Sequence, residues 1–180
     1  MEEAGPTATS TWWQRAVSKE ADRERLGAGE RGGNLIGAAF IAAFVLVVRY
    51  LQDGLLDGFF TSGFGAAEQA AFYGSMLFGT VPNLARALTG RRNIGRLVEV
   101  LSAAVSVASW SYLLTVFPFD FGQLVALLPA GIQGSFGGAV NGLFRLLIVI
   151  GMVISVLGAA YAVVMYFYVW QELRGRGLRR

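Results

Sequence analysis

Four long apolar segments dominate this 180-residue chain, and its arginines gather only in alternate gaps between them. A lipid hydrocarbon core of about 30 Å requires roughly 20 helical residues, and each segment has about that length or more. The pattern therefore predicts an all-α integral membrane protein with four transmembrane helices in up-down order. The expected spans are residues 34–51, 67–88, 94–117 and 143–170, with a glycine-rich loop over 118–142 before the last one.

The composition agrees with a chain whose solvent is lipid. Hydrophobic residues make up 54% of the chain and charged residues 15%, against about 25% charged residues in an average soluble domain. The chain has no cysteine and no histidine. Disulfides, thiolate chemistry, zinc sites, haem held by histidine or cysteine and serine–histidine catalysis are therefore excluded. We expect neither a cofactor nor an enzymatic activity.

The positions of the basic residues predict the orientation, because basic loops remain on the cytoplasmic side of a membrane. The N-terminal tail over 1–33, the gap after the second span and the C-terminal tail over 171–180 carry nearly all of the arginines. Both termini are therefore expected in the cytoplasm, in a multi-pass protein of the cell membrane. Within the N-terminal tail, residues 15–25 form either an interfacial helix or part of a tail without regular structure.

Residues 121–140 offer a five-span alternative, because they carry no charge and are long enough to cross. They also contain Pro129 and five glycines, which weaken both the helix and its partition into lipid. A crossing here would place the C-terminal arginines outside the cell. Four spans are therefore favoured, with a short helix at the membrane surface over 123–128.

The segment over 67–88 is the weakest of the four, since it contains Pro82. Proline removes a backbone donor and clashes with the preceding turn, so we expect a kink near this residue. Without this crossing, three spans would remain and the C-terminal arginines would lie outside, against the orientation rule.

Small residues recur at helical spacing in two places. In the third span they are separated by four and three residues and share one face, and in the outer loop they follow the small-xxx-small spacing of membrane helix contacts. Both sets predict a helix-packing face. The alternatives are a polar lining for a substrate path in the span and a flexible connection or a re-entrant segment in the loop. The two sets are Ser102, Ser106 and Ser109, and Gly134, Gly138 and Gly142.

Charged residues near the membrane are the best candidates for function, because ionisable groups in spans are costly. Glu99 follows Arg96 by three residues and Arg92 by seven, which predicts an ion pair within the helix, or else a proton or ion site. Arg49 precedes Asp53 by four residues at the outer end of the first span, and the helical spacing of apolar residues there predicts that the helix continues.

Arg145 lies two residues into the fourth segment, at its outer end. A long arginine side chain can reach the lipid headgroups from this position. Snorkelling of this kind is the expected role of Arg145.

The sequence predicts a class of protein rather than an activity. We expect a non-catalytic subunit or scaffold that packs with itself, as a homo-oligomer, or with another membrane protein. Its other partner is the lipid bilayer, with anionic headgroups near the cytoplasmic arginines, and no nucleic acid is expected. The first alternative is a channel or transporter component for an ion or small solute, and the second is a lipid-modifying membrane enzyme.

Overall fold

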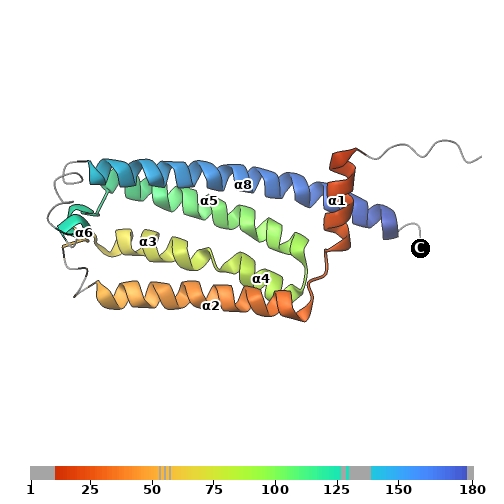
Figure 1. Ribbon diagram of the computed structural model, residues 1–180, viewed down its shortest axis with the longest axis horizontal. Coiled ribbons are helices and arrows are strands. Elements are labelled where there is room, and N and C mark those ends of the chain that lie inside the picture. The colour runs from red at the N-terminus through yellow and green to blue at the C-terminus, as the bar shows by residue number, and fades with distance from the viewer. Residues whose placement is uncertain are drawn as a thin grey trace, which may run out of the picture.

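The computed structural model of the chain describes residues 11–52, 54, 56, 58–126, 129 and 139–177. Within these ranges the regular structure is helical, and strand-like pairing is confined to two isolated bridges. The all-α prediction is therefore confirmed (Figure 1). The helices are α1 (Trp12–Asp22), α2 (Ala28–Leu51), α3 (Ala66–Phe78), α4 (Val81–Thr89), α5 (Arg92–Val116), α6 (Gly122–Ala126) and α8 (Val140–Gly177).

Three helices, α2, α5 and α8, are long and apolar enough to cross a membrane. They contain 24, 25 and 38 residues, which correspond to about 36, 37 and 57 Å of helix. Each length exceeds the ~30 Å of a hydrocarbon core. Large apolar side chains are exposed along all three, Ile36, Leu101 and Leu157 among them. Such exposure is expected where lipid replaces water as the solvent.

The segment expected as one span over 67–88 is divided into α3 and α4. The division lies at Gly79 and Thr80, where both the backbone N–H and the hydroxyl of Thr80 donate to the Leu77 carbonyl. Pro82 follows in the first turn of α4, where its missing N–H leaves no bond unmade. The kink expected near Pro82 is therefore a break. Neither α3, with 13 residues, nor α4, with 9, is long enough to cross alone.

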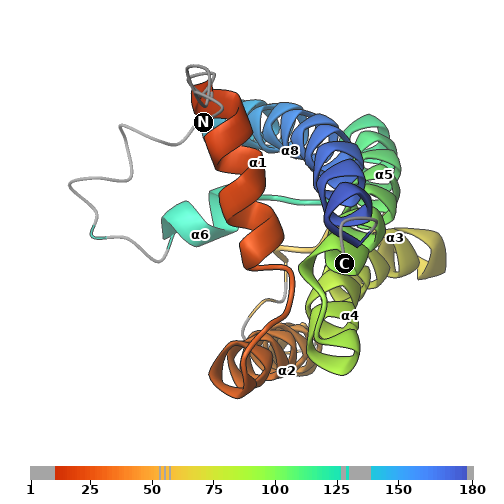
Figure 2. The ribbon, with the colours of Figure 1, turned by 90° about the vertical axis from the view of Figure 1, so that its right-hand side faces the viewer.

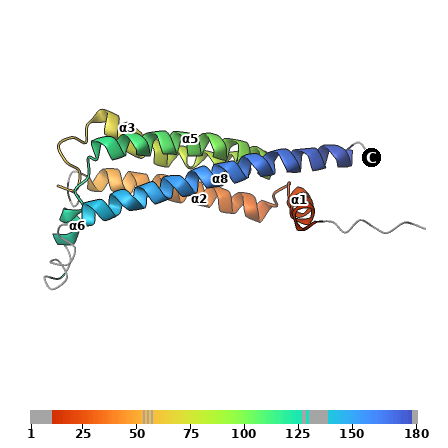
Figure 3. The same ribbon diagram turned by 90° about the horizontal axis from the view of Figure 1, so that it is seen from above.

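Seen along their axes, the long helices form a curved row rather than a closed bundle (Figure 2). Seen from above, they run along the long axis of the molecule (Figure 3). α5 packs against α8 on one side and against α3 and α4 on the other, and α2 packs against α3 and α4. No comparable packing between described residues joins α2 to α8, the two ends of the row. The row is consequently open along one side.

At one end of the row, α1 crosses the C-terminal half of α8 (Figure 1). Val17 and Ala21 of α1 are buried against Met165 and Val169 of α8. Thr11 starts α1 with a capping box, in which its side chain and that of the third helical residue satisfy backbone N–H groups reciprocally. Of the two expectations for residues 15–25, the helical one is therefore correct.

At the other end, two connecting segments meet in a cluster of aromatic rings. Phe60 and Phe119 pair through their backbones, and both rings lie within 6 Å of Phe72 of α3. Leu113 of α5 is fully buried in the same cluster. α2 ends at Leu51 instead of continuing as a helix, because the chain turns there to bring Phe59 and Phe60 into the cluster. The described residues of the expected helical extension, 54, 56 and 58–60, are not helical.

Candidate functional site

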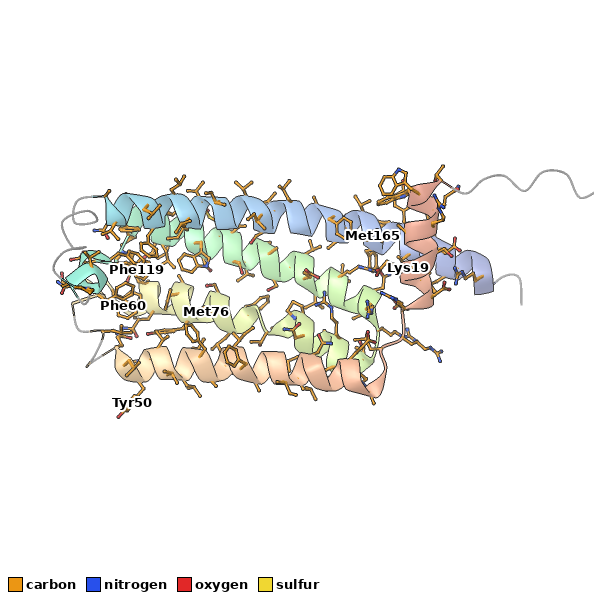
Figure 4. All side chains as sticks on the ribbon, in the orientation of Figure 1. Lys19, Tyr50, Phe60, Met76, Phe119 and Met165 are labelled. Carbon is orange, nitrogen blue, oxygen red and sulfur yellow. The ribbon has the colours of Figure 1, made fainter. Side chains whose placement is uncertain are left out.

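Ion pairs connect α5 to three other helices at the end of the row where α1 lies. Figure 4 shows Lys19 and Met165 at this end and Phe60 and Phe119 at the opposite one. Arg96 is the most shielded arginine of the set, with 12% of its side chain exposed. Removing the partner of a shielded charge lowers the free energy of unfolding more than removing the partner of an exposed charge. The three pairs are Arg86–Glu99 from α4, Arg92–Glu30 from α2 and Arg96–Glu20 from α1.

Glu99 has a different partner from the one that its spacing predicts. The expected partners, Arg92 and Arg96, belong to its own helix, but the carboxylate accepts a hydrogen bond from Arg86 of α4. Arg92 and Arg96 are paired with α2 and α1 instead. The predicted ion pair within α5 is therefore wrong, and Glu99 forms its ion pair with another helix. The pair joins two helices and so bears on tertiary structure.

The turn between α4 and α5 is held by residues near the start of α2. Gly90 ends α4 with a φ of 64°, a left-handed conformation that glycine adopts without strain. Its carbonyl accepts a hydrogen bond from the N–H of Leu26 at 2.9 Å. Arg31 donates to the Ala87 carbonyl at 2.7 Å and so satisfies one of the last acceptors of α4.

Glu24 lies between α1 and α2 and contacts the start of α5. The backbone N–H of Asn93 donates to its carboxylate at 3.0 Å. Burial raises the pKa of the Glu24 carboxyl, and this effect outweighs the opposing effects of the Asn93 bond and of Arg96, Arg91 and Arg92. The charged form of Glu24 is therefore less favourable in the folded chain than in water.

A polar cavity of about 460 Å³ opens among these ion pairs. Its lining combines arginines and glutamates from α1, α2, α4 and α5 with the amides of Asn34 and Asn83. Gly33 of α2 also lines it, and a Cβ atom at Gly33 would meet nothing within 4 Å. The charged lining residues are Glu20, Glu30, Arg86, Arg92 and Arg96.

A second cavity, of about 480 Å³ and mainly apolar, lies between α3, α5 and α8. Trp110 of α5 and Ile148 of α8 supply large side chains to its wall. The space exists because small residues face it, including Gly79 beside the α3–α4 break and Gly151 of α8. A Cβ atom at Gly151 would meet nothing within 4 Å.

The three serines expected on a packing face have separate positions. Ser102 is buried and donates to the Phe78 carbonyl at 3.2 Å, which joins α5 to the end of α3. Ser106 lines the apolar cavity. Ser109 is half-buried. Close helix contact is therefore seen at Ser102, while Ser106 leaves space beside α5.

Of the three glycines expected to form a packing face, Gly142 lies within the described part of the chain and Gly134 and Gly138 lie outside it. Gly142 is exposed in the first turn of α8, and a Cβ atom there would meet nothing within 4 Å. The described chain therefore places no close neighbour against Gly142.

Arg49 and Asp53 were expected one helical turn apart at the end of the first span, with their charges either paired or solvated, and Asp53 lies outside the described residues. Arg49 donates to the side-chain oxygen of Gln52 at 3.3 Å. The same oxygen accepts a hydrogen bond from the Tyr73 hydroxyl at 2.9 Å, so this group links α2 to α3.

Arg145 lies near the start of α8, at the end of the row with the aromatic cluster. Its guanidinium lies 4.0 Å from the centre of the Phe117 ring. This distance is typical of a cation–π contact, which holds the side chain against α5. Snorkelling to the headgroups, the role expected for Arg145, would not require this aromatic neighbour.

Sequence reasoning left out most of the charge network, including Glu20, Glu30 and Arg86. The sequence did contain a signal for this polar site, because Asn34 and Asn83 are amides within apolar segments. In the described ranges, no three acidic side chains converge as a metal site would require. Comparison with protein-family models, curated proteins and solved structures found no match. The geometry alone therefore has to support a function.

Proposed function

We propose that this chain is a four-span protein of the cell membrane that acts without catalysis, as a subunit or scaffold. It packs laterally against a second copy of itself or against another membrane protein. Both termini lie in the cytoplasm, near anionic lipid headgroups. The observation that carries the proposal is the open row of helices, in which α2 and α8 each have packed neighbours on one side.

The topology is supported by where the basic residues gather. α3 and α4 follow one another between α2 and α5, so together they supply the fourth crossing despite the break at Gly79. The basic residues of α1, of the α4–α5 turn and of the end of α8 lie at one end of the row (Figure 1). The positive-inside rule assigns this end to the cytoplasm.

A hydrogen bond argues against a fifth crossing over 121–140. The backbone N–H of Phe121 donates to the Asn141 side-chain oxygen at 2.8 Å. The two ends of the segment therefore lie together, whereas the ends of a crossing segment would be separated by about 30 Å. The first part of the segment is α6, which agrees with the short helix expected there.

Lateral packing is supported by the positions of the long helices in the row. α5 has packed neighbours on both sides, while α2 and α8 lie at the two ends of the row and expose many large apolar side chains. Lipid tolerates such an apolar surface. Membrane helices also associate with one another, however, when small and apolar residues on their outer faces pack closely. An assembly would give α2 and α8 the second neighbour that the single chain does not provide.

Transport is the weaker reading of the polar cavity. The lining changes from charged to mainly apolar along α5, from Arg96 to Val107 and Trp110. Beyond Trp110 the aromatic cluster fills the far end of the row. A path for an ion would need polar groups through both regions.

Single-cysteine labelling tests the topology, because the chain has no cysteine of its own. Gly175→Cys marks the end of α8 and Gly63→Cys the opposite end, and neither position is crowded. A membrane-impermeant maleimide added to intact cells should label Gly63→Cys and leave Gly175→Cys unlabelled until the cells are lysed. Labelling of Gly175→Cys in intact cells would overturn the four-span topology.

Cross-linking in native membranes tests the packing role. A photoreactive residue at Ile36, exposed on α2, should give a defined adduct of the chain with itself or with one membrane protein. The same residue at Trp12, exposed on α1, serves as the control outside the span. Lipid adducts alone at Ile36 and at an equivalent α8 position, Leu157, would refute the proposal.

A further inference from the structure

The polar and apolar cavities lie along the same face of α5. Arg92 lines the first and Trp110 the second, and the 18 positions between them correspond to about five full helical turns. Arg96 of the polar cavity and Val107 of the apolar one also share this face, because the eleven positions between them correspond to about three helical turns. The two cavities therefore follow one another along the helix.

The α3–α4 side of the cavities shows the same alignment. Gly79 lines the apolar cavity, and Asn83, about one turn later, lines the polar one. The backbone at Gly79 and Thr80 keeps right-handed helical angles through the break, so these residues remain on neighbouring turns of one face. The cavities therefore follow one another along one seam, the line between α3–α4 and α5.

The charge along this seam is strongly asymmetric. Three arginines and two glutamates line the polar cavity, and each arginine is paired with a glutamate, Arg86 with Glu99 outside the lining. The lining residues therefore carry one net positive charge, while the polar side-chain groups of the apolar cavity are serine hydroxyls and the Trp110 indole N–H. The guanidinium groups are partly shielded, between 12% and 28% exposed. Shielded guanidinium groups bind phosphate oxygens through paired, charge-assisted hydrogen bonds.

The spacing along the seam matches one leaflet of a bilayer. Arg96 and Val107 are separated by about 16 Å along α5 at 1.5 Å per residue. Half of the ~30 Å hydrocarbon core is about 15 Å. A phosphate at the level of the arginines would therefore place the apolar cavity at the depth of its acyl chain.

We propose that the chain binds one anionic phospholipid of the inner leaflet along this seam. The headgroup phosphate lies at Arg92 and Arg96, and one acyl chain occupies the apolar cavity beside Trp110. A helix from a second copy is a poorer occupant, because a helix is about 10 Å across and each cavity is of small-ligand size. The inference depends on the membrane topology proposed above and is independent of lateral packing.

Trp110 provides a direct probe of the apolar cavity. Replacing Trp12, Trp13 and Trp170 by phenylalanine leaves Trp110 as the single tryptophan. Phosphatidylglycerol with brominated acyl chains should quench its fluorescence in detergent micelles at a concentration about tenfold lower than brominated phosphatidylcholine does, a difference typical of one good charged contact. Millimolar inorganic phosphate should leave the quenching unchanged, because the acyl chain contributes to binding.

Two cavity-filling variants separate the headgroup from the acyl chain without changing any charge. Gly33→Leu projects into the polar cavity and should remove the preference for phosphatidylglycerol. Gly151→Leu projects into the apolar cavity and should reduce quenching by both lipids. Gly32→Leu and Gly158→Leu are matched controls, since both glycines have open space and neither lines a cavity.

The inference is overturned if the two lipids quench Trp110 equally, or if Gly33→Leu behaves like Gly32→Leu. Loss of quenching on addition of inorganic phosphate would assign the arginines to a free anion and also overturn it. Native mass spectrometry of the unaltered chain gives a second measurement that does not depend on variant folding. From an equal mixture of the two lipids, the chain should retain one phosphatidylglycerol, and equal retention of both would contradict the proposal.

Discussion

The side chain of Arg86 lies directly over Gly95, so that a Cβ atom at Gly95 would come within 2.3 Å of the Arg86 Cγ. Gly95 is buried in the first turns of α5, one turn before Glu99. The missing side chain therefore gives Arg86 of α4 a path to the Glu99 carboxylate. A single glycine determines which arginine pairs with Glu99, and it leaves Arg96 available to α1.

Gly95→Ala should destabilise the folded chain, although alanine is the better helix former. The helix preference favours alanine by about 1 kcal/mol, but overpacking costs about 1–3 kcal/mol and the Arg86–Glu99 pair is lost as well. We expect a lower midpoint of thermal unfolding in detergent. Gly74→Ala is the control, since a Cβ atom at Gly74 of α3 would meet nothing within 4 Å. An equal rise in midpoint for both variants would contradict the role of Gly95.

The features that were predicted correctly depend on local sequence. The apolar runs determine where α2, α5 and α8 lie, because lipid selects helices of sufficient length and hydrophobicity. At Pro82 the prediction was correct only in part, because a kink was expected there and the helix instead breaks at Gly79 and Thr80, with Pro82 in the first turn of α4. The short helix α6 also lies where it was expected.

The features that were not predicted depend on residues far apart in the chain. Glu99 and Arg86 lie on opposite sides of the α4–α5 turn, 13 positions apart. Arg96 pairs with Glu20, which lies 76 positions away in the sequence. Spacing within a helix cannot reveal such partners, because it reports only neighbours on the same face. The same holds for the pairing of Phe60 with Phe119, which ends the first helix earlier than its apolar spacing suggested.

Arg96→Gln should loosen α1 from α8. The variant removes the pair with Glu20 and leaves that carboxylate partly shielded without its cation. Val17→Cys reports the change, because Val17 is buried against Met165 and Val169 in a chain without other cysteines. Its labelling by a thiol reagent should become about tenfold faster, which corresponds to ~1.4 kcal/mol of lost docking energy.

The control for this experiment is Arg174→Gln. This variant removes a cation that lies 4.9 Å from the Trp170 ring, and both residues belong to α8. Its effect on the labelling of Val17→Cys should be small. Similar acceleration in both variants would mean that general charge, and not the Arg96–Glu20 pair, holds α1 in place.

Phe119→Ala should destabilise the chain strongly, by about 3 kcal/mol or more. Phe119 is 4% exposed and its ring contacts those of Phe60, Phe64 and Phe72, so truncation leaves a cavity in the aromatic cluster. Phe40→Ala is the control, because this ring is exposed to lipid on α2. Unfolding in detergent should distinguish the two, and similar midpoints would show that the cluster contributes little to stability.

Glu24→Gln should stabilise the chain relative to the wild type at neutral pH and lose this advantage in acid. Burial raises the pKa of the Glu24 carboxyl above its unfolded value, so the stabilising contribution of the protonated form is complete below the unfolded pKa and is lost as the pH rises through the folded one. Glutamine keeps an acceptor for the Asn93 N–H without a buried charge. The difference in unfolding midpoint between variant and wild type should therefore shrink as the pH is lowered from 7 to 4. A constant difference over this range would show that the ionisation of Glu24 does not affect folding.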